Sequence, residues 1–201
     1  MSAAPIDFYF DFSSPYGYFA AQKIEALAAK HGRTVDWHPV LLGAIFRETG
    51  GAPLTTLPIK GDYSKRDFER SARFHGVPYR PPSRFPIATQ APARIVLWLK
   101  GRDAALAARV AKALYRAYFV DDVDISDPDG AAAVAAAQGV DAAAARAAVD
   151  DPAIKDALKR EVDAAIAAGV FGSPFVLVDG EPFWGLDRFD QLERWLATGG
   201  F

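Results

Sequence analysis

The stretch Ile6-Asp7-Phe8-Tyr9-Phe10-Asp11-Phe12, followed by Ser13-Ser14-Pro15-Tyr16-Gly17, decides how this chain begins to fold. The first seven residues alternate, with Ile6, Phe8, Phe10 and Phe12 on one face, which predicts a β-strand. Proline is best tolerated in the first turn of a helix, so Pro15 marks a helix start with Ser14 as its N-cap. This helix is expected to run to the cationic last turn and glycine of Lys30-His31-Gly32.

The two ends of the chain together predict one sheet. Thr34-Val35-Asp36-Trp37-His38 is a second strand, parallel to the first, which makes a β-α-β unit. Phe171-Gly172-Ser173-Pro174 leads into a strand over 175–178, a hairpin turn at Asp179-Gly180, a short edge strand over 181–184 and a closing amphipathic helix over 187–196. A strand, an elbow and a helix, with a later X-Pro before a strand, is the layout of a thioredoxin-like active site. A proline at the position of Pro174 is usually cis in such a site, although most X-Pro bonds are trans.

The middle of the chain differs from its ends. Between about 43 and 169 there is no convincing strand. Residues 63–74 form one helix candidate, and further candidates, rich in alanine, cover 91–99, 102–119, 128–138 and 151–168. We therefore predict an α/β protein with a thioredoxin-like domain of residues 1–42 and 170–201. A large all-helical insertion domain, residues 43–169, separates its N-terminal βαβ unit from its C-terminal ββα unit.

Composition excludes several functions. The chain of 201 residues has no cysteine, so its own side chains cannot exchange disulfides, although a thioredoxin-like elbow usually carries Cys-x-x-Cys. Its net charge of -2 argues against general attraction to nucleic acids or membranes, and no apolar run reaches the roughly 18 residues of a membrane span. No signal peptide is recognisable, so a cytoplasmic location is the default, and three histidines without cysteine make a metal site unexpected.

Three features could carry chemistry. Ser14 is either only an N-cap or also a hydroxyl donor to a thiolate that a ligand brings to the helix N-terminus. Asp187 is either an N-cap or a carboxylate that grips an α-amino group, and the two roles are compatible. The segment 60–84 has an excess of four positive charges and interleaved aromatics, which makes it either a solvated helix face or a pocket wall for an aromatic carboxylate.

Taken together, these motifs resemble the 2-hydroxychromene-2-carboxylate isomerase family, which is itself similar to kappa-class glutathione transferases and to DsbA without its cysteines. The resemblance rests on four stretches spread over nearly the whole chain: Phe10-Asp11-Phe12-Ser13-Ser14-Pro15-Tyr16, Asp124-Ile125-Ser126-Asp127-Pro128, Gly169-Val170-Phe171-Gly172-Ser173-Pro174 and Trp184-Gly185-Leu186-Asp187-Arg188. It implies a homodimer that binds glutathione and a small aromatic carboxylate substrate.

The resemblance also implies a set of site residues. Ser14 corresponds to the catalytic serine, and the expected glutathione contacts are Ser14, Pro15, Tyr16, Gly51, Ser173, Pro174, Leu186 and Asp187. Relatives often carry asparagine where this chain has Gly51, which can offer only its backbone. If Pro174 is cis, the N–H and C=O of Ser173 are expected to be free for a peptide-like ligand. Lys60, Arg66 and Arg84 are the candidates for holding a substrate carboxylate.

The implied reaction opens a cyclic hydroxychromene carboxylate to its benzylidenepyruvate isomer, as glutathione thiolate adds to the conjugated carbon and is later expelled. Two alternatives stay open on the sequence. A kappa-class-like glutathione transferase would use the same activated thiolate and keep it on the product. A thioredoxin-like binding module that lost its cysteines would not be an enzyme.

Overall fold

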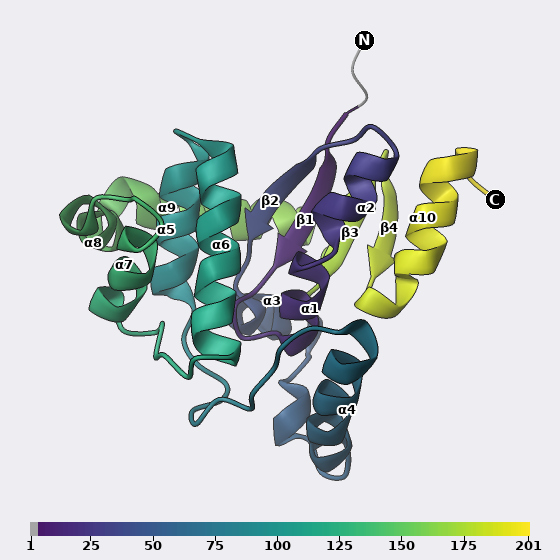
Figure 1. The fold of residues 1–201 in the computed structure, drawn as a ribbon, viewed down its shortest axis with the longest axis horizontal. Coiled ribbons are helices and arrows are strands. Elements are labelled where there is room, and N and C mark those ends of the chain that lie inside the picture. The colour runs from purple at the N-terminus through teal and green to yellow at the C-terminus, as the bar shows by residue number, and fades with distance from the viewer. Residues whose placement is uncertain (1–3) are drawn as a thin grey trace.

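A four-stranded mixed sheet forms the centre of the protein (Figure 1), which a computed structural model describes over residues 4–201. Its strands, β1 (Ile6–Phe10), β2 (Val35–Pro39), β3 (Phe175–Val178) and β4 (Glu181–Trp184), lie in the order β2-β1-β3-β4. The β1–β2 pair is parallel, and the other two pairs are antiparallel. The predicted thioredoxin-like α/β fold is confirmed, and Pro182 lies on the edge strand, where no further neighbour needs its missing N–H.

The prediction of one continuous helix after β1 is wrong. It is divided into α1 (Pro15–Ala21) and α2 (Ile24–Lys30), with a turn at Gln22 and Lys23. The turn contains neither glycine nor proline, so no local signal predicts it. After β4 the chain forms a short 3-10 helix, η2 (Leu186–Arg188), and then α10 (Phe189–Thr198), which buries the predicted face of Phe189 and Leu192.

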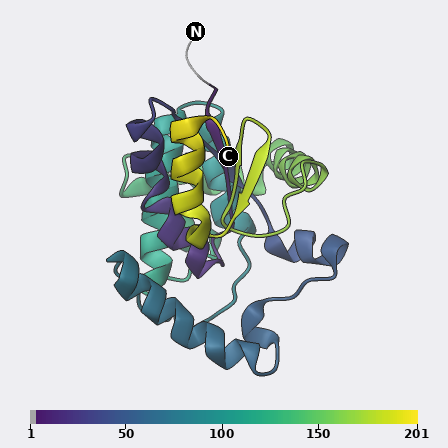
Figure 2. The same cartoon turned by 90° about the vertical axis from the view of Figure 1, so that its right-hand side faces the viewer.

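Within the described residues, all regular elements between β2 and β3 are helical. They are α3 (Leu42–Thr49), η1 (Leu54–Thr56), α4 (Lys60–His75), α5 (Gln90–Lys100), α6 (Ala104–Phe119), α7 (Pro128–Ala136), α8 (Ala142–Asp150) and α9 (Pro152–Ala167). Helices α5 to α9 gather beside the sheet (Figure 1), whereas α4 and η1 extend away from the body as an arm (Figure 2). None of the described helices is long and apolar enough to cross a membrane.

Two of these helices were absent from the sequence prediction, for different reasons. The first N–H of α3 has no local cap, because Leu41 supplies no side-chain bond and Leu42 donates instead to the distant Asp11 carboxylate at 2.6 Å. The start of α8 was visible in principle, since Asp141 accepts from Ala144 N–H at 2.7 Å as an ordinary N-cap.

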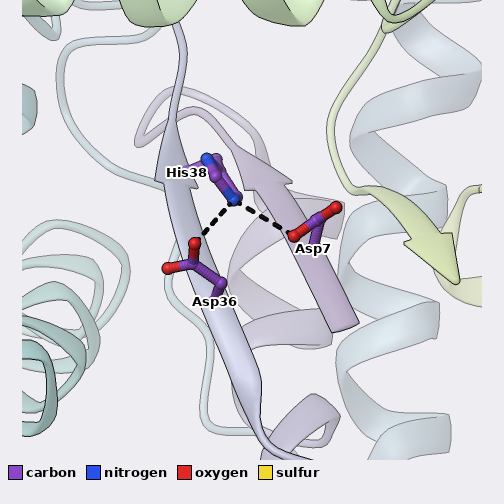
Figure 3. A group of neighbouring side chains, drawn as sticks. All are labelled: Asp7, Asp36 and His38. Atoms are coloured by element: carbon purple, nitrogen blue, oxygen red, sulfur yellow. Dashed lines mark ion pairs between the residues drawn. The ribbon is translucent and has the colours of Figure 1, made fainter. Parts of the chain in front are cut away.

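A cluster of charged side chains links the sheet to the helical layer. His38 of β2 lies with its Nε2 atom 3.1 Å from Asp36 Oδ2 and 3.4 Å from Asp7 Oδ1 (Figure 3). Its Nδ1 atom lies 2.5 Å from Glu161 Oε1 of α9, and Lys100 of α5 pairs with Asp36 at 2.7 Å. Burial would lower the pKa of His38, but hydrogen bonds with Asp36 and Glu161 raise it to about 9.

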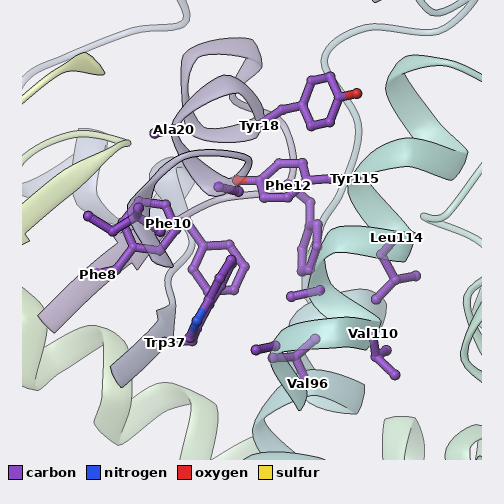
Figure 4. Close-up of a cluster of buried hydrophobic side chains, with 14 of the residues drawn as sticks. Phe8, Phe10, Phe12, Tyr18, Ala20, Trp37, Val96, Val110, Leu114 and Tyr115 are labelled. Carbon is purple, nitrogen blue, oxygen red and sulfur yellow. The ribbon is translucent and has the colours of Figure 1, made fainter. Parts of the chain in front are cut away.

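The apolar residues of β1 divide between two cores, one on each face of the sheet. Phe8 and Phe10 pack with Trp37 and with Leu114 and Tyr115 of α6 in the larger core (Figure 4). Tyr9, which points to the opposite face, belongs to a second core with α3 and α9. The sheet and the helices therefore share both cores, while the division of the chain into two domains stays a prediction.

Candidate active site

The elbow after β1 holds a serine hydroxyl in a defined place. Ser14 is the N-cap of α1, as predicted, and its Oγ accepts a hydrogen bond from Gly17 N–H at 3.0 Å. The same Oγ donates to the carbonyl oxygen of Ser173 at 2.8 Å, and Ser14 is only 5% exposed. The hydroxyl therefore has both a donor and an acceptor partner, and its proton points at the loop that precedes β3.

That loop has the predicted cis bond between Ser173 and Pro174. The prediction that both backbone groups of Ser173 are free is wrong for the carbonyl, because Ser14 occupies it. The Ser173 N–H donates no hydrogen bond within residues 4–201, so the donor half of the prediction is retained. Its side chain is also engaged, since Ser173 Oγ accepts from Asp11 N–H at 3.0 Å.

Asp11 organises this site and was not singled out by sequence reasoning. Its carboxylate accepts from Ser13 N–H at 2.7 Å and from Leu42 N–H at 2.6 Å, and it is 2% exposed. Burial raises the pKa of Asp11, while the hydrogen bonds from Leu42 and Ser13 oppose this shift. The one available signal was an acidic residue between the apolar Phe10 and Phe12 at the end of a buried strand. Asp11 thus connects the Ser14 elbow to the start of α3.

One large cleft, about 2450 Å³ in volume, opens beside the elbow. All eight predicted glutathione contacts line it: Ser14, Pro15, Tyr16, Gly51, Ser173, Pro174, Leu186 and Asp187. Typical small-molecule sites enclose about 300–1,000 Å³, so this cleft has room for two small ligands at once. These eight residues come from both ends of the chain and from the loop after α3. Their roles in binding glutathione stay predictions.

Asp187 does not cap a helix. It lies inside η2, the N-cap of α10 is Arg188, and no side chain caps that helix. The Asp187 side chain is 74% exposed and pairs with its neighbour Arg188 at 3.1 Å. The N-cap alternative for Asp187 is therefore wrong, and its role in ligand binding stays a prediction.

The ring of Phe46 explains why residue 51 has no side chain. A Cβ atom on Gly51 would lie 2.7 Å from Cδ1 of the Phe46 ring, closer than such atoms approach. Both residues line the cleft. An aromatic ring therefore occupies the space that a side chain at position 51 would need.

The structure does not bring the three predicted carboxylate-binding cations into the cleft. Lys60, Arg66 and Arg84 are exposed outside its lining, and Arg84 pairs with Asp124 at 2.5 Å. The cations that do line it are Lys23, Lys30, Arg47, Arg70 and Arg188. Among the described residues, Lys23 and Arg47 make no ion pair, whereas the other three do.

A short polar chain fixes Tyr16 at the cleft wall. The Tyr16 hydroxyl donates to Asp67 of α4, which also pairs with Arg70. Burial and the bond to Asp67 raise the pKa of Tyr16 above its usual value. Tyr16 is therefore a neutral donor that ties the elbow to the arm.

The second polar cluster, around His38, offers another kind of site. Ligand atoms of Asp7, Asp36 and His38 lie within 4.8 Å of one another, a grouping that could hold a metal ion. However, Lys100 and Glu161 already neutralise part of this group. We interpret the cluster as an ion-pair network and do not assign a metal to it.

The fold and the elbow define a cysteine-free protein of the thioredoxin class with a ligand cleft at the usual place of the dithiol. The family described as DSBA-like thioredoxin domain matches residues 5–197. The chain is 33% identical to 2-hydroxychromene-2-carboxylate isomerase of Sphingobium xenophagum, over 95% of this chain and 97% of that protein. It therefore belongs to the 2-hydroxychromene-2-carboxylate isomerase family, within the DSBA-like thioredoxin domain family.

Two further similarities bear on function. A solved structure of a 2-hydroxychromene-2-carboxylate isomerase superposes with a TM-score of 0.85 at 28% identity and covers 96% of this chain and 94% of its own. Glutathione S-transferase kappa 1 of Caenorhabditis elegans is 28% identical, over 93% of this chain and 88% of that protein. The resemblance inferred from the sequence motifs is confirmed for the fold and the family.

Proposed function

We propose that this protein is a glutathione-dependent isomerase that converts a 2-hydroxychromene-2-carboxylate, or a close analogue, to its open-chain benzylidenepyruvate isomer. The observation that carries the proposal is the Ser14 hydroxyl, held at the N-terminus of α1 at the wall of a cleft in a chain without cysteine. Membership of an isomerase family supports the reaction, and similarity to a glutathione transferase supports the cofactor.

The residues of the cleft fit glutathione. The unpaired Ser173 N–H suits a peptide carbonyl of the tripeptide, and the exposed Asp187 carboxylate suits its α-amino group. The N-terminus of α1 favours an anion, and Ser14 supplies a hydroxyl there. Gly51 and Phe46 would give this end of the site an aromatic wall in place of a polar side chain. When bound, glutathione would supply a thiolate that adds reversibly to the conjugated carbon of the substrate.

The protein's own part in this chemistry is a change of hydrogen-bond partner at Ser14. Its Oγ keeps the bond from Gly17 N–H, while the O–H rotates from the Ser173 carbonyl toward the sulfur. Because a hydroxyl carries one proton, it can serve only one of these acceptors at a time. A thiolate held at the N-terminus of α1 would compete with the Ser173 carbonyl for this proton, and the negative charge makes it the stronger acceptor.

The substrate carboxylate needs a cation in the cleft, and Arg47 is the best candidate. It lies in the last turn of α3, lines the cleft, and makes no ion pair within residues 4–201. Lys23 also lines the cleft without an ion pair among the described residues. However, a guanidinium group binds a carboxylate through two hydrogen bonds and so fixes its orientation, which favours Arg47. Arg47→Gln should raise KM for the anionic substrate, while Arg66→Gln, on the exposed face of α4, should not.

A kappa-class-like transferase is the second candidate, and the similarity to the Caenorhabditis elegans enzyme favours it. The two reactions differ in what happens to the thiol. An isomerase regenerates glutathione, so a catalytic amount supports many turnovers, whereas a transferase consumes one glutathione per product. The homodimer and the cytoplasmic location stay predictions.

Titration calorimetry with reduced glutathione, followed by a turnover assay with sub-stoichiometric glutathione, tests the proposal. We expect saturable binding and full conversion of the chromene carboxylate. Binding with conversion limited to the glutathione supplied would instead favour the transferase. Flat calorimetry and no turnover would leave the non-catalytic binding module as the better interpretation.

A further inference from the structure

Two aromatic side chains lie exposed in the wall of the cleft without a role in the mechanism above. Phe171 is 44% exposed and Trp184 is 55% exposed, and both line the cleft. Their ring centroids are 4.9 Å apart at an interplanar angle of 64°, so they form one continuous apolar surface. Large aromatic rings left in contact with solvent in a concave site usually mark a binding surface.

The backbone beneath these rings keeps the indole beside the elbow. A Cβ atom on Gly172 would lie 2.3 Å from Trp184 Nε1, so the indole occupies the space where any side chain at position 172 would begin. Trp184 pairs with Phe175 in the β3–β4 ladder, and the next residue, Gly185, donates its N–H to the Pro174 carbonyl at 3.0 Å. The aromatic pair is therefore fixed on both sides of the cis-proline loop.

This position is close to the reactive hydroxyl. Ser173, whose carbonyl accepts the Ser14 proton at 2.8 Å, directly follows Gly172 in the chain. The backbone beneath the aromatic pair is thus one residue away from the carbonyl to which Ser14 donates, and consecutive Cα atoms are about 3.8 Å apart. The aromatic pair and the hydrogen-bond partner of Ser14 therefore belong to one short loop.

We propose that Phe171 and Trp184 form the subsite for the planar aromatic ring of the substrate, an inference that rests on the proposed function and assigns the ring's place within it. Two rings in the wall of a cleft match a ligand of ring size, whereas a protein partner requires a broader apolar area. Aromatic pairs gain energy from edge-to-face contacts beyond simple burial, so the subsite distinguishes an aromatic from a saturated ring.

Nuclear magnetic resonance of the tryptophan indoles tests this subsite without any turnover. The chain has four tryptophans, and Trp37, which is buried, serves as the internal control. The probes are trans-2-hydroxycinnamate and trans-3-(2-hydroxycyclohexyl)prop-2-enoate, which share the hydroxyl and the unsaturated carboxylate chain and differ in whether the ring is aromatic. We expect the Trp184 indole N–H signal to shift with the hydroxycinnamate at about tenfold lower concentration than with the cyclohexyl analogue. Equal responses to both probes, or no Trp184 response, would overturn the assignment.

Substitutions sharpen the test. Trp184→Leu should weaken hydroxycinnamate binding about tenfold and leave the Kd of glutathione within about twofold. Gly172→Ala should weaken it in part, because the indole must move away from the new Cβ atom. Tyr63→Leu, which alters an exposed aromatic outside the cleft lining, is the matched control and should change neither value.

Two outcomes separate this inference from the function on which it rests. Wild-type discrimination between the probes without glutathione-dependent turnover would refute the isomerase and keep the aromatic subsite. Turnover with normal discrimination in Trp184→Leu would refute the subsite and keep the isomerase. If Trp184→Leu instead converts a dimer to a monomer in analytical ultracentrifugation, the aromatic pair is an interface between copies and the subsite is refuted.

Discussion

Around Ser14 hydroxyl and peptide groups line an open cleft, whereas around His38 five charged side chains pack against one another. The Ser14 hydroxyl has partners it can exchange, and Ser173 N–H has none within residues 4–201. In the His38 cluster, by contrast, each charge already has an opposite charge nearby. One arrangement is suited to receiving a ligand and the other to holding β2, α5 and α9 together.

This difference shows that a shifted pKa does not by itself locate an active site. Despite burial, hydrogen bonds with Asp36 and Glu161 raise the pKa of His38 to about 9, yet His38 is not among the residues that line the cleft. Perturbed pKa values often cluster at functional sites, but structural ion networks produce them too. The four predictions that follow test whether the Ser14 cleft serves function and the His38 cluster serves stability, from the largest expected effect to the smallest.

His38→Gln should lower the free energy of unfolding by about 3–5 kcal/mol, because it leaves Glu161 partly buried without a cation and Asp36 with Lys100 alone. The folded fraction should retain normal turnover. Urea unfolding measures the first effect, and an assay normalised to folded protein measures the second. Lys159→Gln, which breaks the exposed pair with Asp163, is the control and should cost less than about 1 kcal/mol. A loss of turnover in the folded His38 variant would contradict the division.

Ser14→Ala should show the opposite pattern. Turnover should fall about 10²-fold or more, since a hydrogen bond to a developing charge is worth about 3 kcal/mol. Stability should fall by only about 1–2 kcal/mol, from the lost N-cap and the lost bond to Ser173. Thiolate absorbance of bound glutathione, followed against pH, reports the thiol pKa directly. An unchanged thiol pKa in the variant would remove Ser14 from the mechanism.

The pH dependence of stability should come from the His38 cluster. The folded pKa of His38 is about 9 and its ordinary value is 6.5, so protonation stabilises the fold fully below pH 6.5. This stabilisation is lost as the pH rises through 9, and it amounts to at most about 3.5 kcal/mol at 1.4 kcal/mol per pKa unit. Despite partial burial, hydrogen bonds with His38 hold the pKa values of Asp36 and Glu161 below their usual range, so both partners stay ionised as His38 titrates. The difference in unfolding free energy between the wild type and His38→Gln should therefore be large at pH 6 and small at pH 9.5. An equal difference at both pH values would refute the linkage.

Asp187→Asn should weaken glutathione binding about tenfold, or about 1.4 kcal/mol, and leave stability unchanged, because Asp187 makes no helix cap. Calorimetry should show a much smaller loss for a des-amino analogue, which lacks the group that the carboxylate binds. Arg188→Gln is a useful comparison, since it removes the partner of Asp187 but keeps its charge. Equal weakening of both ligands by Asp187→Asn would mean that the carboxylate does not grip the amino group.

Local patterns predicted the parts of the fold that carry their own signals. Neighbouring residues alone predict the alternation in β1, the helix start at Ser14-Pro15 and the turn at Asp179-Gly180. The start of α3 could not be predicted in this way, because its supporting acceptor is Asp11, far back in the chain. The same holds for the site. Motifs located Ser14 and Ser173 separately, but the hydrogen bond from Ser14 Oγ to the Ser173 carbonyl oxygen depends on the folding of segments far apart in the chain.

Charge counting along the chain located the segment and not the individual residues. Lys60, Arg66 and Arg84 of the basic segment lie outside the cleft lining, whereas Arg70 of the same segment lines the cleft together with Arg47 and Lys23. Which face of a helix meets a cleft depends on packing, which a count of charges along the chain does not contain. The role of the three predicted cations in substrate binding stays a prediction.

The bond between Asp11 and Leu42 suggests where hybrid proteins could be joined. Leu42 contributes only its backbone N–H, at 2.6 Å from the Asp11 carboxylate, so the contact does not depend on which side chain stands at position 42. A foreign arm grafted after residue 41 would keep the anchor as long as its first residue presents an N–H and is not proline. The Ser14 elbow could thus be combined with different segments in place of α3 and the arm, each giving the cleft beside the Ser14 hydroxyl a different shape.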